Sequence, residues 1–250
     1  MKNALILGSD SAVGRAAVLS AAKHGYNTVL LPFDPSDPSD RLASQVTATG
    51  QKAHVLRSAC HDDVDARACM DEATRALGEA MTLLVLPCRD ALGDTLENVS
   101  PHSWETNLNS VLGTPLWLIQ AFAAQLPPPT PDERGELAAS GLVISVVDRR
   151  LRGGEAENLT FSLAQEGLKS LTRTAALSLA PKCRVNEIGL GPEPQGTYQK
   201  HPPYAKRQSE GRSGVSDFEA AFGYFLDMPS LTGQHILVDA DPVYNGTTQA

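Results

Sequence analysis

The sequence predicts an α/β protein: a doubly wound parallel sheet with helices on both faces. Short apolar runs without polar alternation recur along the chain, which is typical of strands buried on both faces. Segments with apolar residues at helical spacing separate these runs. The length of 250 residues suits one domain of this kind, and we find neither a repeat nor a second domain. We therefore expect a single domain over residues 1–250.

The expected strands and helices alternate in order. The strands are short apolar runs: Ala4–Leu7, Thr28–Leu31, Ala53–Leu56, Met81–Leu86, Leu142–Val147, Arg184–Ile188 and His235–Val238. The helices lie between them: Ala12–Lys23, Arg41–Gly50, Val64–Leu77, Trp104–Leu126 and Leu159–Leu179. Gly78 and Pro181 follow two of these helices and are helix stop signals. Strands separated by helices predict parallel pairing.

Two stretches lack this regularity. Pro127–Pro131 is rich in proline and joins the first long helix to the next strand. Residues 192–214 are rich in Pro, Gly and charge and predict a lid-like loop. Its basic residues leave two interpretations open, a solvated loop or a lid over an anionic ligand; they are Lys200, Lys206, Arg207 and Arg212. Residues 232–250 are expected to form the last strand and a C-terminal tail.

Charge and composition restrict the possible partners. Lys and Arg number 21 against 29 Asp and Glu, which gives a formal net charge of −8. This charge disfavours binding to nucleic acid and to anionic membranes. No apolar run approaches the roughly 20 residues of a membrane span. The four cysteines lack metal-ligand spacing, so we expect a cytoplasmic protein with reduced thiols and no metal.

Several landmarks, in order and at matching spacing, resemble the short-chain dehydrogenase/reductase family. Gly8-Ser9-Asp10-Ser11-Ala12-Val13-Gly14 stands where the family has its glycine-rich turn. Arg184-Val185-Asn186 is similar to the family's penultimate strand, and Thr232-Gly233-Gln234 to the start of its last strand. The resemblance covers essentially the whole chain and implies a Rossmann-type fold. It does not settle the activity, which depends on the site.

The family's catalytic residues are replaced at every aligned position. Phe161 stands for the catalytic Tyr, Gln165 for the Lys, Asp148 for the Ser and Ser110 for the Asn. Phe161 cannot transfer a proton, and the uncharged Gln165 cannot lower a neighbouring pKa. An ionised Asp148 would repel a developing alkoxide. The resemblance therefore implies that the family's usual reaction is not catalysed here.

The positions that bind cofactor in the family also differ. Ala12 replaces the middle glycine of the turn, Pro32 stands where NAD-binding relatives often have an acid, and Ala59 replaces the acid after the third strand. We interpret Gly8 and Gly14 as residues kept for tight helix–strand packing. We therefore expect these five positions to be vestigial and the chain to bind no cofactor.

These losses suggest a non-catalytic subunit. We expect an active paralogue of the family, carrying NAD, to pair with this chain in a heterodimer or heterotetramer that oxidises an alcohol, such as an aromatic hydroxyacyl-CoA. Small and apolar residues of the second long helix are expected to pack across a two-fold axis: Ala164, Leu168, Leu171, Ala175, Ala176 and Leu179. Two alternatives remain: an enzyme with altered chemistry that uses Asp148, alone or with Cys88, and a ligand-sensing binding protein.

Overall fold

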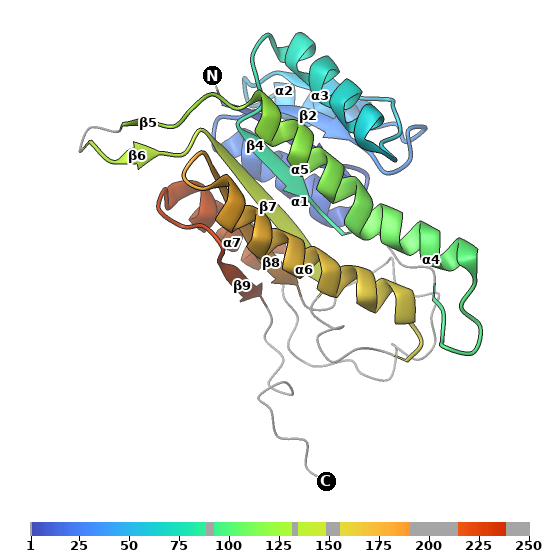
Figure 1. Ribbon diagram of the computed structural model, residues 1–250. Coiled ribbons are helices and arrows are strands. Elements are labelled where there is room, and N and C mark those ends of the chain that lie inside the picture. The colour runs from blue at the N-terminus through green and yellow to red at the C-terminus, as the bar shows by residue number, and fades with distance from the viewer. Residues whose placement is uncertain (1, 89–92, 132–134, 149–155, 191–214, 239–250) are drawn as a thin grey trace.

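A seven-stranded parallel sheet forms the centre of the computed structural model (Figure 1). The structure describes residues 2–88, 93–131, 135–148, 156–190 and 215–238. The strand order is β3-β2-β1-β4-β7-β8-β9, and all neighbouring strands are parallel. The order reverses direction next to β1, which is the point where open α/β sheets form a ligand-binding crevice. The predicted doubly wound parallel sheet is confirmed.

The elements follow the expected alternation closely. The sheet strands are β1 (Asn3–Leu7), β2 (Asn27–Leu31), β3 (Ala53–Val55), β4 (Leu83–Leu86), β7 (Gly141–Asp148), β8 (Cys183–Leu190) and β9 (His235–Val238). The helices are α1 (Ala12–Lys23), α2 (Asp40–Thr47), α3 (Asp63–Leu77), α4 (Pro101–Leu108), α5 (Thr114–Gln125), α6 (Leu159–Leu179) and α7 (Val215–Asp227). A π-helical turn, η1 (Asn109–Gly113), joins α4 to α5.

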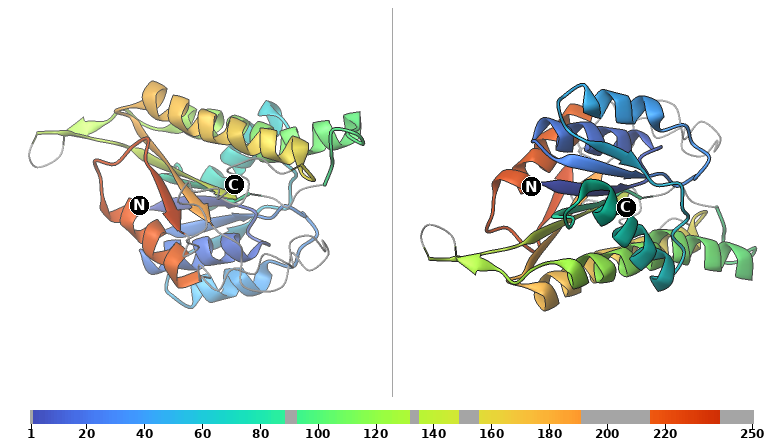
Figure 2. Two further views of the ribbon diagram at one scale, coloured as in Figure 1. Left: turned by 90° about the horizontal axis from the view of Figure 1, so that it is seen from below. Right: turned by 90° about the horizontal axis from the view of Figure 1, so that it is seen from above.

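The helices cover the sheet in two layers. Figure 2 shows α5 and α6 on one face and α1 and α7 on the other. Each face of the sheet has its own apolar core, and alternate residues of β1 lie in one or the other. Leu5 and Leu7 pack toward α3, α5 and α6, whereas Ala4 and Ile6 pack toward α1 and α7. Because both faces of the strand are buried, its sequence is continuously apolar instead of alternating.

The structure differs from the expected elements in three places. Helix α7 was not predicted, although Phe218, Phe222 and Phe225 recur at helical spacing and are buried. The predicted helix Trp104–Leu126 is divided by η1 and begins at Pro101. The proline-rich stretch contributes β5 (Thr130–Pro131), which pairs with β6 (Leu137–Ala138) in a short antiparallel ladder. The predicted loop at 192–214 and the tail beyond Val238 lie outside the described residues.

The small and apolar residues of α6 do not form an exposed seam. Ala164, Leu168, Ala175 and Ala176 are buried, and Leu171 and Leu179 pack against the core of the same chain. The expectation that these residues face a partner was wrong. Their helical spacing places them on the face of α6 that packs on the sheet of the same chain. The exposed face of α6 carries Leu163 and Leu177 instead, which are 50% and 84% exposed.

A buried carboxylate fixes the start of α6. Asp94, which follows β4, accepts hydrogen bonds from the Thr160 N–H at 2.9 Å and the Thr160 hydroxyl at 2.6 Å. The Asn107 side chain of α4 donates to the same hydroxyl at 2.7 Å. Burial raises the pKa of Asp94, but hydrogen bonds from Thr160, Ser103 and Leu159 outweigh it and hold the pKa below its usual value. Asp94 thus caps a helix 66 residues further along the chain.

We expect Asp94→Asn to lower the free energy of unfolding by about 2 kcal/mol at neutral pH. The reason is that asparagine has one acceptor oxygen in place of two and no charge, so one of the two buried hydrogen bonds from Thr160 is lost and the other is weakened. The folded-state pKa of Asp94 is depressed, so its stabilisation is present above the usual carboxylate pKa and is lost as the pH falls through the folded value. Urea unfolding curves of the variant and the unmodified chain should therefore converge at acid pH.

The matched control is Asp71→Asn, which removes an exposed carboxylate from the middle of α3. It should change the unfolding free energy by about 0.5 kcal/mol or less. An Asp94→Asn variant as stable as this control would show that the carboxylate does not hold α6.

Candidate functional site

A cavity of about 330 Å³ opens at the carboxyl edge of the sheet, beside β1. Its walls come from the ends of β1 and β2, from the segment after β3, and from α4, η1 and the start of α5. They include Leu7, Pro32, Phe33, Ala59, His61, Asn109, Ser110 and Thr114. This is the crevice in which ligands bind in doubly wound sheets. Apolar walls with a few polar groups, as found here, are typical of small-molecule binding sites.

The glycine turn brings α1 against the end of β1. Gly8 has a φ of +62°, which favours glycine, and a Cβ at Gly14 would lie 1.9 Å from the Gly8 carbonyl oxygen. The Ser11 hydroxyl donates to that oxygen at 2.8 Å and accepts from the Gly14 N–H at 2.9 Å. Both glycines therefore serve close packing, as their sequence positions suggested. The turn also directs the N-terminus of α1 toward the crevice, where it favours anions.

Asp10 provides a carboxylate that contacts the backbone of Phe33, a residue that lines this cleft. It accepts hydrogen bonds from the backbone N–H of Phe33 at 2.8 Å and of Asp34 at 3.1 Å. The glycine turn is thereby joined to the segment after β2, and the Phe33 ring lies against Gly8. Sequence comparison with the family directs attention to Pro32, the residue after β2; besides Asp34, the segment after β2 is reached by the Asp10 carboxylate of the glycine turn.

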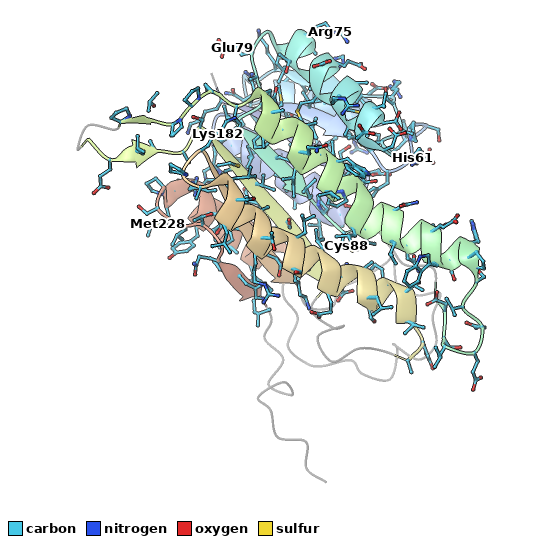
Figure 3. All side chains as sticks on the ribbon, viewed as in Figure 1. His61, Arg75, Glu79, Cys88, Lys182 and Met228 are labelled. Carbon is cyan, nitrogen blue, oxygen red and sulfur yellow. The ribbon has the colours of Figure 1, made fainter. Side chains whose placement is uncertain are left out.

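Gln165 and Phe161 are both buried beside the end of β4. The Gln165 side-chain N–H donates to the Cys88 sulfur, and its carbonyl oxygen accepts from the Asp148 backbone N–H at 3.4 Å. Phe161 packs with Val111 and Ala164, and Cys88 lies against this cluster. Figure 3 labels Cys88, close to α6 and well separated from His61 at the start of α3. Gln165 thus joins β4 to β7 through neutral hydrogen bonds.

The four positions aligned with catalytic residues gather at the same edge. Asp148 is the last residue of β7 and is only partly buried. In the sheet, β4 lies between β7 and β1, the strand beside the cavity. Ser110 lies in η1, where its hydroxyl donates to the Thr106 carbonyl at 2.7 Å, and it lines the cavity. Asp148 is therefore the one ionisable side chain among the four aligned positions.

The sequence did not predict several polar residues that line the cavity: His61, Glu105, Thr106, Asn109 and Thr114. Asn109 precedes Ser110 in the π-helical turn, and His61 precedes α3. Cys60 also lines the cavity and shares a hydrogen bond with Cys69 that, with burial, raises the pKa of the Cys60 thiol. The sequence signal for Asn109 was its place directly before Ser110, the position aligned with the family's catalytic Asn.

Neither a metal cluster nor a spanning helix occurs in the described ranges. No group of three or more His, Cys, Asp or Glu side chains there could hold a metal ion. No helix there is sufficiently long and apolar to cross a membrane.

The family model described as short chain dehydrogenase matches residues 2–197. The chain therefore belongs to the short-chain dehydrogenase family. This match agrees with the parallel sheet, the glycine turn and the crevice beside β1.

Similar proteins include named dehydrogenases. L-Rhamnose 1-dehydrogenase (NAD(P)(+)) of Sphingomonas sp. (strain SKA58) is 23% identical over 98% of this chain and 97% of its own. The (2S)-[(R)-hydroxy(phenyl)methyl]succinyl-CoA dehydrogenase subunit BbsC of Thauera aromatica is 29% identical over 76% of this chain and 72% of its own. The structure of FolM alternative dihydrofolate reductase 1 from Brucella canis, complexed with NADP, has a TM-score of 0.80 at 24% identity. That alignment covers 95% of this chain and 92% of the neighbour.

These comparisons overturn two expectations from the sequence. We expected a chain that is not an enzyme and that binds no cofactor. The relatives carry the names of dehydrogenases, one of them with NAD(P)(+), and the structural neighbour holds NADP. The error has a physical cause. This fold binds a dinucleotide largely through backbone groups and the crevice itself. The side chains at Ala12, Pro32 and Ala59 can therefore differ from those of the family without loss of the site.

Proposed function

We propose that this chain is an NAD-dependent oxidoreductase of alcohols in which the Asp148 carboxylate replaces the family's tyrosine as the proton acceptor. The observation that carries the proposal is the placement of a cavity and a carboxylate along one edge of the sheet. The cavity lies beside β1, and Asp148 ends β7, which is separated from β1 only by β4. Membership of the short-chain dehydrogenase family supports it.

The residues of the cleft fit a dinucleotide. The turn at Gly8–Gly14 and the first turn of α1 would hold the pyrophosphate, since helix N-termini attract anions. Ala59 and Thr114 would contact the adenine, and Asn109 offers it an amide. Ala12 is exposed, so its methyl group does not fill the turn.

The chemistry divides between the cofactor and this chain. When bound, NAD supplies the acceptor for the hydride that leaves the alcohol carbon. Asp148 accepts the hydroxyl proton as the carbonyl forms, so no full alkoxide faces the carboxylate. A positioned general base typically contributes about 10²–10⁴-fold to the rate. Because the proton leaves as the carbonyl forms, the substrate oxygen does not carry a full negative charge that the Asp148 carboxylate would repel.

The neighbours of Asp148 suit this role. Gln165 takes the position of a lysine, and its neutral amide oxygen accepts a hydrogen bond from the Asp148 backbone N–H. Its hydrogen bonds to Cys88 and to the Asp148 N–H hold the ends of β4 and β7 together. Phe161 forms an apolar wall next to them, which limits the access of water.

We expect Asp148→Asn to lower kcat for alcohol oxidation at least 10²-fold while NADH binding stays within twofold. The relative from Thauera aromatica is named for a CoA thioester, so an aromatic hydroxyacyl-CoA is the first substrate class to assay, by NADH absorbance. Cys88→Ser is the matched control at the same edge and should retain most of the activity. Full turnover by Asp148→Asn would assign the proton to another group.

Asp10 leads us to expect NAD in preference to NADP. Its carboxylate already occupies the Phe33 and Asp34 N–H groups, retains lone pairs for ribose hydroxyls, and would repel a 2′-phosphate. Fluorescence titration should give a dissociation constant for NADH at least tenfold below that for NADPH. Asp10→Asn should reduce this ratio to about threefold or less, whereas Asp71→Asn on α3 should leave it unchanged. Equal binding of both cofactors by the unmodified chain would contradict the role of Asp10.

We also propose that the chain assembles with a second, paralogous member of its family. The support is the exposed apolar surface of the long helices, formed by Trp104, Leu116, Leu163 and Leu177, together with the naming of the Thauera relative as a subunit. Mass measurement of the chain expressed with a paralogue should give a heteromer. Leu177→Asp should shift it to smaller species without unfolding the chain. A purely monomeric mass in both cases would refute the assembly.

A further inference from the structure

A second cavity, of about 370 Å³, is lined by α6 and the carboxyl-terminal strands of the sheet. It is formed between α6 and the last strands, β8 and β9, which lie side by side at the edge of the sheet (Figure 1). Its charged or polar walls include Glu166, Lys169 and Arg173 from α6, Glu187 from β8 and His235 from β9. None of these residues lines the cleft beside β1.

Glu187 is the unusual residue of this cavity. Val185 and Cys183, two and four positions earlier in β8, lie in the apolar core beneath α6, and alternation places Glu187 on the same face. Its side chain is only 4% exposed. His235, directly opposite in the β8–β9 pairing, contacts one carboxylate oxygen through Nδ1. The other oxygen, Oε2, is buried without a hydrogen-bond partner among the described residues.

An unpartnered carboxylate oxygen is costly to bury. Loss of hydration without a compensating donor destabilises the folded chain, and more so for a charged group. Glu187 lines an open cavity, so a ligand can supply the missing donor. A protonated amine is the strongest complement, because it offers both charge and N–H groups.

The α6 wall of the cavity carries two cationic side chains, Lys169 and Arg173. Lys169 is neutralised by Glu166, whose carboxylate lies 2.5 Å from the ammonium group. Arg173 follows Lys169 by four residues on the same face of α6, is exposed, and has no ion pair in the part of the chain that the structure describes. Its planar guanidinium suits a carboxylate. Val147 and Leu237 supply apolar surface between the charged walls.

We propose that this cavity binds an aliphatic amino acid. The ammonium group donates to Glu187 Oε2, the carboxylate pairs with Arg173, and the side chain contacts Val147 and Leu237. A simple cation would leave Arg173 unmatched, and a simple acid would leave Glu187 without its donor. The site is separate from the cofactor cleft, so this proposal stands independently of the proposed oxidoreductase activity.

The test is calorimetric titration of the full chain with three matched probes. L-Leucine carries both charged groups, 3-methylbutylamine lacks the carboxylate, and 4-methylpentanoate lacks the ammonium. We expect L-leucine to bind at least tenfold more tightly than either analogue. Equal affinity for an analogue, or no binding of L-leucine at 10 mM, would overturn the proposal.

Two variants assign the binding to this cavity. Arg173→Gln alters an exposed side chain and should weaken L-leucine binding at least tenfold, whereas Arg75→Gln on α3 is the matched control and should have no effect. Glu187→Gln should weaken L-leucine binding to a similar extent while leaving the weak binding of 4-methylpentanoate unchanged. If Arg173→Gln binds L-leucine as tightly as the unmodified chain, the site is not the one described.

Discussion

The hydrogen bonds between Asp94 and Thr160 determine where α6 begins, and the site depends on that position. Asp94 follows β4, and Asn107 of α4 bonds to the same Thr160 hydroxyl, so the first turn of α6 is tied to two other elements. Phe161 is the next residue, and Gln165 lies one turn further. Because these contacts fix the rotation and height of α6, Gln165 reaches both Cys88 and the Asp148 N–H.

Most of the fold could be predicted from the sequence because burial on both faces produces a simple pattern. The continuous apolar residues of β1 and β4 have no other common explanation in a chain of alternating helices. Helix α7 was missed because it follows an irregular stretch, although its three phenylalanines had the right spacing. The π-helical turn η1 was not predictable, since one added residue per turn leaves local apolar spacing almost unchanged.

The site was predicted in part. The replaced positions Asp148, Phe161 and Gln165 follow from counting along a recognised pattern, and the structure places them at one edge. The contact of Asp10 with Phe33 and Asp34 could not be found this way, because the donors are backbone N–H groups that every residue possesses. The same limitation explains the incorrect expectation about cofactor. Side-chain identity says little about a nucleotide site made mainly of backbone and a helix N-terminus.

The central claim is that the crevice beside β1 holds a nicotinamide dinucleotide although the tyrosine and lysine of the family are absent. A crystal structure of the unmodified chain grown with NADH tests it most directly. The account predicts adenine between Ala59 and Thr114, ribose hydroxyls on the Asp10 carboxylate, and the nicotinamide end near Asp148. Crystals grown at saturating NADH that show an empty crevice, or a dinucleotide bound elsewhere, would contradict it.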